Sequence, residues 1–188
     1  YLVSSRNDEC YNFFFMKKKK IFNIVGIMTG TSMDGIDISF VSTDGINKII
    51  ILSEKSYRYT LTEYKNIKKY LLEINNNKKV INLNDDKIAK LIVKYLKKFF
   101  KEIKIKNVDY ISMSGQTILH NPSKKISIQL GNPKLISNYF KINVISNFRY
   151  NDIMNGGQGA PIGAFYHKLL LKKTNYRAVI INLGGVAN

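Results

Sequence analysis

The chain has 188 residues, 45% of them hydrophobic, and its 30 Lys and Arg outnumber its 13 Asp and Glu, which gives a formal net charge of +17 at pH 7. A chain of this length and hydrophobic content can bury a sizeable core, which excludes a disordered protein. The single cysteine, Cys10, excludes an internal disulfide and a zinc site built from cysteine pairs, so we expect a reducing compartment, the cytoplasm.

The positive charge raises the question of a polyanionic partner. The excess is mostly lysine, it is scattered along the chain, and only the lysines at 17–20 form a block. No RNP, zinc-finger or KH signature accompanies the charge, so we expect no nucleic-acid partner. No apolar run approaches the roughly 20 residues of a membrane-spanning helix, and the phenylalanines at 13–15 precede the lysines that a signal peptide would place before them. We therefore expect neither a membrane partner nor secretion.

Strands are predicted from residue 21 onwards. Residues 1–15 show no clear period and are left out of the predicted fold, and 1–20 are treated as a tail of uncertain status. Apolar runs rich in β-formers predict strands at 22–28, 36–41, 46–52, 108–113, 126–130, 143–146 and 178–183. Because Asp44-Gly45 is a hairpin dipeptide, the first three strands are expected to form a meander.

Helices are expected between these strands. Capping residues and apolar positions at three- and four-residue spacing predict helices at 60–74, at about 88–99 and at about 161–172. The asparagines at 75–77 are expected to form the loop between the first two. Asn132 followed by Pro133 predicts an N-cap with proline in the first helical turn.

This order of elements predicts one α/β domain at 21–176 and the start of a second at 177–188. The last predicted strand enters a Gly184-Gly185 turn, and the sequence stops directly after it. A β-turn-β element normally continues into a strand that pairs with the first. We therefore expect the second domain to be truncated.

The first polar cluster lies in the turn between the first two predicted strands. It contains Gly30, Thr31, Ser32, Asp34 and Gly35. Such a turn can present N–H groups and hydroxyls to a phosphate, because glycine lets the backbone come close and adopt positive φ. A carboxylate there could hold Mg²⁺ through water. An ordinary hairpin turn is the alternative, and the P-loop pattern is missing.

A second cluster directly follows the predicted strand 108–113. It contains Ser112, Ser114, Gly115, Gln116, Thr117 and His120. Polar groups at the carboxyl end of a strand in an open α/β sheet commonly face a ligand crevice. A capped loop is the alternative, and a lone His120 is more often structural than catalytic.

Two more clusters lie nearer the end of the sequence. The third surrounds Gln158 with glycines and contains Arg149, Asp152, Gly156, Gly157, Gln158 and Gly159. Three glycines around one glutamine make a loop that must bend sharply or approach something closely. A buried ion pair is the alternative for the two charged residues. The fourth again places glycines at a strand end, with Asn182, Gly184 and Gly185.

Five runs of sequence together resemble one family. This chain resembles the anhydro-N-acetylmuramic acid kinase family, whose motifs it matches in the same order and at approximately the same spacing. The matching runs are GIMTGTSMDGID, SGQTILHNP, IQLGNP, NFRYNDIMNGGQGAP and INLGGVAN. The family belongs to the sugar kinase, Hsp70 and actin superfamily, so the resemblance implies an actin-like (ribonuclease H-like) domain. It also implies ATP and Mg²⁺ as cofactors, a sugar as substrate and, as an expectation only, a homodimer.

The resemblance implies roles for individual residues. The residues that match phosphate-binding segments are Gly30, Thr31, Ser32, Asp34, Gly35, Asn182, Gly184 and Gly185. The residues that match segments lining the sugar site are Ser114, Gly115, Gln116, Thr117, Arg149, Gln158 and Gly159. Asp152 matches the catalytic base, which activates a water that opens 1,6-anhydro-N-acetylmuramic acid while O6 takes the γ-phosphoryl group of ATP. The product is N-acetylmuramic acid 6-phosphate, an intermediate of peptidoglycan recycling.

The sequence also departs from the family pattern. Ser114 and Tyr166 stand where histidines are usual, and Asn132 and Asn147 stand where aspartates are usual. Loss of an imidazole and a carboxylate near the sugar removes groups that orient it. Two hypotheses therefore stay open: an enzyme fragment that is inactive alone, and a non-catalytic or decayed basic domain that keeps only the motifs.

Overall fold

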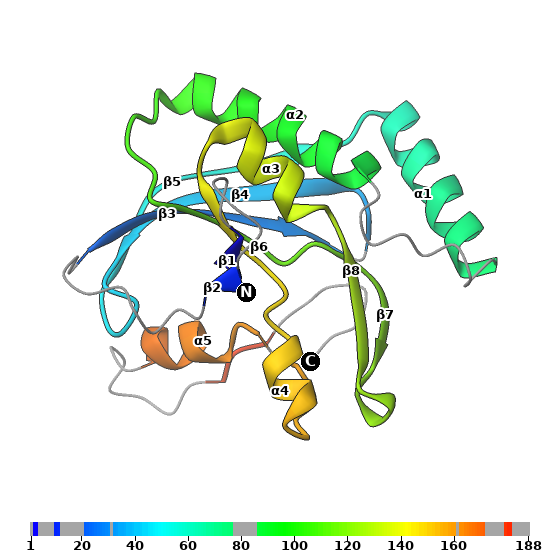
Figure 1. The fold of residues 1–188 in the computed structure, drawn as a ribbon. Helices are drawn as coiled ribbons and strands as arrows, with labels where there is room; N and C mark the ends of the chain where they lie inside the picture. Colours follow the sequence, from blue (N-terminus) through cyan, green and yellow to red (C-terminus); the bar gives the residue numbers. More distant parts are fainter. Residues whose placement is uncertain are drawn as a thin grey trace.

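The computed structural model describes residues 2–3, 10–11, 21–30, 32–76, 86–160, 162–171 and 179–181, which form a mixed α/β fold (Figure 1). The strands are β1 (Leu2–Val3), β2 (Cys10–Tyr11), β3 (Phe22–Thr29), β4 (Gly35–Thr43), β5 (Ile49–Arg58), β6 (Tyr110–Met113), β7 (Gln116–Asn121), β8 (Ile126–Leu130) and β9 (Asn143–Ile145). The helices are α1 (Leu61–Asn76), α2 (Asp86–Ile103), α3 (Pro133–Phe140), α4 (Tyr150–Met154) and α5 (Ala164–Leu171), with a 3₁₀ helix at Pro122–Lys124.

The central sheet has seven strands in the order β2-β1-β9-β6-β3-β4-β5. Strands β9, β6 and β3 run parallel at its centre, and each contains a fully buried residue, Val144, Ile111 and Val25 respectively. Strands β3, β4 and β5 pair antiparallel in succession, and β7 and β8 form a separate hairpin. Parallel strands that are buried on both faces appear in a sequence as continuous apolar runs. For this reason the three central strands could be predicted from their apolar residues.

Helices cover the two faces of this sheet. Figure 1 shows α2 and α3 above the sheet and α5 below it. An apolar stripe of α2 faces the core and is at most 5% exposed at Ile88, Ile92, Tyr95, Leu96 and Phe99. The lysines of α2 occupy its exposed side. The periodicity expected for this helix is confirmed, and part of the positive charge is a solvated helix face.

The start of β5 differs from the prediction of a strand at 46–52. Asp44 Oδ1 accepts hydrogen bonds from the N–H groups of Ile46, Asn47 and Lys48 at 2.9, 2.9 and 2.8 Å. These bonds hold 45–48 in a loop, because aspartate at the start of a turn competes with strand pairing for the backbone donors. The strand therefore begins at Ile49, and it continues to Arg58 because β4 runs beside it throughout.

Two predictions about the chain outside the main elements are wrong. Residues 1–15 were expected outside the fold, but Leu2–Val3 pairs antiparallel with β9, whose outer edge is otherwise open, and with Cys10–Tyr11. Asn75 and Asn76 were expected in a loop, but they are the last two residues of α1; asparagine has a weak helix propensity, which does not prevent it from extending an existing helix by a residue or two. Asn77 lies outside the described residues.

The C-terminal elements also differ from the prediction. Helix α5 begins at Ala164, three residues after the predicted start, since its first turn is closed by the bond from His167 N to Gly163 O at 3.0 Å. Of the strand predicted at 178–183, the structure describes 179–181, which forms no strand. Val179 and Ile181 are 85% and 67% exposed, and a strand forms only where a neighbour pairs with it.

The start of α1 is joined to α2 through Glu63. Glu63 N donates to Thr60 Oγ1 at 3.2 Å, and Glu63 Oε2 accepts from Thr60 N at 2.8 Å, which is a capping box. Two donors from α2 reach the same carboxylate: Lys94 Nζ at 2.6 Å and Tyr95 Oη at 2.8 Å. The Glu63 side chain is only 16% exposed, whereas the Lys94 side chain is 61% exposed, so the ion pair is open to water on the lysine side.

The Glu63 carboxylate makes the free energy of unfolding depend on pH. Burial alone raises the pKa of Glu63, but the hydrogen bonds from Lys94, Thr60 and Tyr95 outweigh it and lower the pKa from 4.5 to about 2. Glu63 therefore binds a proton more tightly in the unfolded chain than in the folded protein. The stabilisation that its charged form gives the fold is complete above about pH 4.5 and is lost as the pH falls toward 2. We expect Glu63→Gln to lower the free energy of unfolding by roughly 1–3 kcal/mol at neutral pH.

Urea unfolding at neutral pH and at about pH 3 checks this expectation. The difference between the wild type and Glu63→Gln should shrink as the pH falls. A difference of the same size at both pH values would mean that the Glu63 charge contributes nothing. Glu73→Gln, on the same helix, is the matched control.

Candidate functional site

Most predicted site residues follow three neighbouring parallel strands. The register places the carboxyl ends of β3, β6 and β9 at one edge of the sheet. The segments that leave this edge are 30–34, 114–115 and 146–160, which we call the first, second and third loops. Ligands of open α/β sheets bind outside the carboxyl ends of the strands. The topology therefore brings residues more than a hundred positions apart to one end of the domain.

The first loop is a tight turn with an exposed carboxylate. Gly30 O accepts from Met33 N at 3.1 Å, and Met33 has a φ of 58°. Ser32 Oγ donates to Asp34 Oδ1 at 2.5 Å. This hydrogen bond, followed by the main chain of Asp34 and the charge of Arg58, lowers the pKa of Asp34. The loop therefore presents an ionised carboxylate to solvent, whereas Thr31 lies outside the described residues.

Gly35, grouped by sequence with this loop, is the first residue of β4 and pairs with Arg58. A Cβ atom added at Gly35 would overlap the carbonyl oxygen of Tyr57 and lie 3.4 Å from Cα of Arg58. Asp34 O also accepts from Tyr59 N at 2.9 Å, so the end of the loop is fastened to the end of β5. Glycine at position 35 is required by strand packing.

The last residue of β3 carries an unusual buried hydroxyl. Thr29 is 7% exposed, and its Oγ1 has no hydrogen-bond partner among the described residues. A buried hydroxyl without a partner costs stability, whereas an apolar group of the same shape does not. We expect Thr29→Val to raise the free energy of unfolding by about 1 kcal/mol in urea titrations.

Thr29→Ser is the matched control, because it keeps the hydroxyl and removes only the methyl group. It should lower the free energy of unfolding by about 1 kcal/mol. Destabilisation by Thr29→Val would show instead that the hydroxyl has a partner in the folded protein.

The second loop is shorter than predicted. Ser114 N donates to Ile27 O at 3.3 Å, and Gly115 has a φ of 70° with no room for a side chain, since a Cβ atom would lie 2.8 Å from Leu130 O. Gln116 and Thr117 were expected after the end of a strand, either facing a ligand crevice or in a capped loop, but they begin β7 and pair with β8. Gln116 is buried and Thr117 is half-buried. The chain turns at Gly115 because Leu130, the last residue of β8, lies against Gly115 and pairs with Gln116.

His120, considered with the second cluster, lies farther along β7. Its Nδ1 is 3.0 Å from Ser127 Oγ on β8. This cross-strand contact supports the structural role for His120.

The third loop contains α4, a helix that the sequence analysis missed. Its C-terminus is a Schellman motif: Gly156 N donates to Ile153 O at 3.1 Å and Gly157 N donates to Asp152 O at 2.7 Å. Gly156 has a φ of 89°, the left-handed conformation that this motif requires. The signal for the helix end was present in the sequence as two glycines after Met154-Asn155. A helix of only five residues has too few apolar positions to show a period.

The two charged residues of the third loop share one partner. Gly159 N donates to Asp152 Oδ2 at 2.6 Å, and Arg149 Nη1 donates to Gly159 O at 2.5 Å. Burial lowers the pKa of Arg149. The two side chains are thus joined through the Gly159 main chain, and not as the direct ion pair considered from sequence. Gln158 is exposed.

Gly157 was in the third cluster but was not assigned to a site. A Cβ atom at Gly157 would overlap the Asp152 carboxylate. The glycine pair at 156–157 is the sequence signal for both the helix end and this close approach. The assigned residues Asn182, Gly184 and Gly185 lie outside the described residues.

Metal binding can be considered for the described residues. They contain no group of three or more His, Cys, Asp or Glu side chains that could hold a metal ion. Asp34 is an exposed, ionised carboxylate, and Mg²⁺ bound with a nucleotide needs only one or two such groups because water and phosphate oxygens fill its other positions. The first loop therefore fits a nucleotide-bound Mg²⁺ and does not fit an all-protein metal site.

Two departures from the family pattern have local explanations. Asn132 Oδ1 caps α3 by accepting from Lys134 N at 3.0 Å and Leu135 N at 3.3 Å, as predicted, while its Nδ2 donates to Asp86 Oδ1 at 2.9 Å. Aspartate at this position could cap the helix but could not donate to Asp86. Asn147 has a φ of 60°, a conformation that asparagine tolerates better than most residues.

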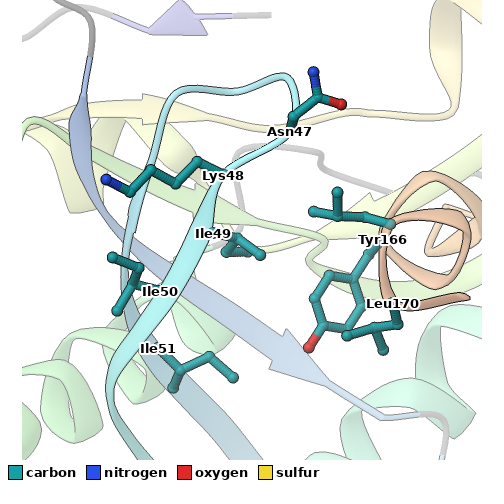
Figure 2. Close-up of a pocket in the computed structure, with 8 residues that line it drawn as sticks. Asn47, Lys48, Ile49, Ile50, Ile51, Tyr166 and Leu170 are labelled. Carbon is teal, nitrogen blue, oxygen red and sulfur yellow. The ribbon is translucent and has the colours of Figure 1, made fainter. Parts of the chain in front are cut away.

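Tyr166 lies away from the three loops. It lines a hollow of about 490 Å³ between α5 and the start of β5, where Ile49 and Ile51 lie on the side of the strand that faces Tyr166 and Leu170 (Figure 2). The register places Ile49 opposite Thr43, which is opposite Phe22 at the start of β3. The hollow is therefore at the opposite end of the sheet from the loops. A second hollow lies between α1 and α2, so neither coincides with the predicted site.

The family model for anhydro-N-acetylmuramic acid kinase matches residues 22–188. The chain belongs to the anhydro-N-acetylmuramic acid kinase family. It is 38% identical over 178 residues to the protein of that name from Pelagibacter ubique (strain HTCC1062), covering 90% of this chain and 47% of the relative. It is 34% identical to that of Shewanella pealeana (strain ATCC 700345 / ANG-SQ1), over 87% of this chain and 45% of the relative.

The chain thus spans about half the length of the curated kinase relatives it matches. The matched region begins at the first residue of β3 and includes all three loops. Among the helices in the described part of the chain, none combines the length and the hydrophobicity that a bilayer crossing requires.

Proposed function

We propose that this chain supplies the sugar-binding and first phosphate-binding segments of an ATP-dependent kinase. The reaction converts 1,6-anhydro-N-acetylmuramic acid, water and ATP to N-acetylmuramic acid 6-phosphate and ADP, in the cytoplasm, as part of peptidoglycan recycling. The observation that carries the proposal is the convergence of the three loops at the carboxyl ends of β3, β6 and β9. It puts an exposed carboxylate of the first loop and one of the third loop at the same edge of the sheet.

The proposed chemistry needs a base beside the sugar. Asp152 accepts a proton from water as the water oxygen bonds to the anomeric carbon and the bond from that carbon to O6 breaks. O6 then forms a bond to the γ-phosphorus of ATP, while the bond from that phosphorus to the β,γ-bridging oxygen breaks and ADP leaves. One oxygen of Asp152 is held by Gly159 N, which leaves the other for water. A carboxylate that activates water opposite a departing oxygen is the arrangement of inverting glycosidases.

The proposed phosphate site is the first loop. Phosphoryl transfer depends on positioning and charge neutralisation more than on covalent help from the protein. Asp34 would hold Mg²⁺ through water, and the Mg²⁺ would neutralise phosphate charge. Ser32 keeps the Asp34 carboxylate oriented through their 2.5 Å hydrogen bond.

The finer fold assignment is also part of the proposal. Three antiparallel strands, β3, β4 and β5, are followed in the same sheet by the parallel strands β6 and β9. This arrangement supports an actin-like (ribonuclease H-like) domain. In such a kinase ATP lies between two related domains, so the residues of the second domain would complete the nucleotide site.

The deciding experiment is phosphoryl transfer from ATP to 1,6-anhydro-N-acetylmuramic acid, with the product identified by mass spectrometry. The 188-residue chain and any longer form of it are compared, with N-acetylmuramic acid, which lacks the anhydro bridge, as the control sugar. We expect transfer to the anhydro sugar in a form that includes the second domain. Absence of transfer in every folded form would favour the decayed, non-catalytic domain.

A further inference from the structure

The backbone of Gly159 lies between the two charged side chains of the third loop. Its N–H donates to Asp152 Oδ2 at 2.6 Å and its carbonyl oxygen accepts from Arg149 Nη1 at 2.5 Å. We propose that the Gly159 main chain is a positioning element that orients the Asp152 carboxylate and leaves Oδ1 to take the proton from water. The role of the carboxylate rests on the proposed function, whereas the positioning rests on the geometry.

Only glycine fits this position. Gly159 has a φ of 65°, and a Cβ atom would lie 2.8 Å from Cδ1 of Ile153 and 3.1 Å from Cβ of Arg149. Ile153 is 2% exposed, so its side chain is enclosed by the protein. A side chain at 159 would therefore be strained and would push the backbone away from Asp152.

A second glycine of the loop holds the main chain of Asp152. Asp152 belongs to α4, and its main-chain oxygen accepts from Gly157 N at 2.7 Å. The residue is therefore held twice, by its carbonyl through Gly157 and by its carboxylate through Gly159. Carboxylate orientation is then determined by backbone donors, which carry less rotational freedom than side-chain donors.

Arg149 acts on Asp152 through this backbone. One N–H group of its guanidinium donates to the Gly159 carbonyl, and this charge-assisted hydrogen bond holds the Gly159 main chain in place beside Asp152. Arg149 is accordingly a positioning residue in this structure. The family resemblance places Arg149 in a segment that lines the sugar site, and the hydrogen bond to Gly159 is a further contact of this side chain.

The first test observes the hydrogen bond without any assay of turnover. In ¹⁵N spectra of the 188-residue chain recorded across the acidic pH range, the Gly159 amide should follow the titration of the Asp152 carboxyl carbon. That response should be lost in Asp152→Asn and weakened in Arg149→Gln. The Gly156 amide, which bonds to Ile153 O, is the internal control. A Gly159 amide that does not follow Asp152 would overturn the proposal.

The second test uses a catalytically active form of the chain. Gly159→Ala should lower kcat about 10- to 100-fold with little change in KM for the sugar, because a misplaced group costs catalysis more than binding. Gly156→Ala is the matched control: its φ is also positive, but nothing lies within 4 Å of the added Cβ. Equal effects of the two substitutions on kcat, with both variants folded, would overturn the positioning role.

The two tests separate the two proposals. If the wild type transfers no phosphate in any form while the Gly159 amide follows Asp152, the kinase function fails and the loop geometry stands. If phosphate transfer is observed and the Gly159 amide does not respond to the protonation of Asp152, the proposed kinase function is supported and the proposed positioning role of Gly159 is wrong. Arg149→Lys, which keeps the charge, should restore part of the activity lost in Arg149→Gln.

Discussion

Asp152→Asn is expected to lower kcat for phosphorylation of the anhydro sugar by about 10²- to 10⁴-fold, the usual contribution of a general base. The amide oxygen of Asn can still accept from Gly159 N, which is 2.6 Å from the carboxylate in the wild type. The loop should therefore keep its shape while the proton acceptor is lost. KM for sugar and ATP should change far less than kcat, because the loss is confined to the transition state.

Asp152→Ala separates the charge from the hydrogen bond. It removes both, and it leaves the buried Gly159 N–H without an acceptor, which costs about 1–3 kcal/mol. Thermal unfolding should therefore show Asp152→Asn near the wild type and Asp152→Ala clearly lower. Wild-type kcat in Asp152→Asn would show that another group accepts the proton.

Gly35→Ala is expected to lower the free energy of unfolding by about 3 kcal/mol, through overpacking against a backbone that cannot move. The added Cβ would overlap Tyr57 O in the neighbouring strand. Strands β4 and β5 would have to separate where Gly35 pairs with Arg58. The first loop would be displaced with them, since Asp34 O accepts from Tyr59 N at 2.9 Å.

Gly26→Ala is the matched control within the neighbouring strand. Its Cβ would lie 3.1 Å from Ser39 Oγ, the end of a side chain that can rotate. The change should stay within about 0.5 kcal/mol in urea unfolding. A Gly35→Ala variant as stable as Gly26→Ala would mean that β4 and β5 separate at their ends without cost.

Local patterns predicted some parts of the fold correctly. The strand at Ile126–Leu130, the α2 stripe and the Asn132 cap followed from a run of β-forming residues, helical spacing and capping chemistry. The prediction failed where a neighbour distant in sequence decided the conformation. Gln116 became a strand because β8 pairs with it, and Leu2–Val3 became one because β9 has an open edge.

The candidate site shows the same division. Its residue types and its family could be identified from sequence, because five short motifs occur in order. The hydrogen bonds of those residues could not. Gly35 is required for the close packing of β4 against β5. Arg149 and Asp152 each form a hydrogen bond with the main chain of Gly159 and do not pair directly with each other.

By itself the sequence determined which segments were apolar strands, which helix carried a buried stripe, and which loops carried glycines and carboxylates. These properties depend on neighbours within a few positions along the chain. Only the tertiary structure decided that the loops after β3, β6 and β9 leave the same edge of the sheet and that one glycine residue, Gly159, binds two charged side chains through its N–H and its carbonyl oxygen. Both depend on parallel pairing and close backbone approach between residues distant in sequence, where local propensity carries no information.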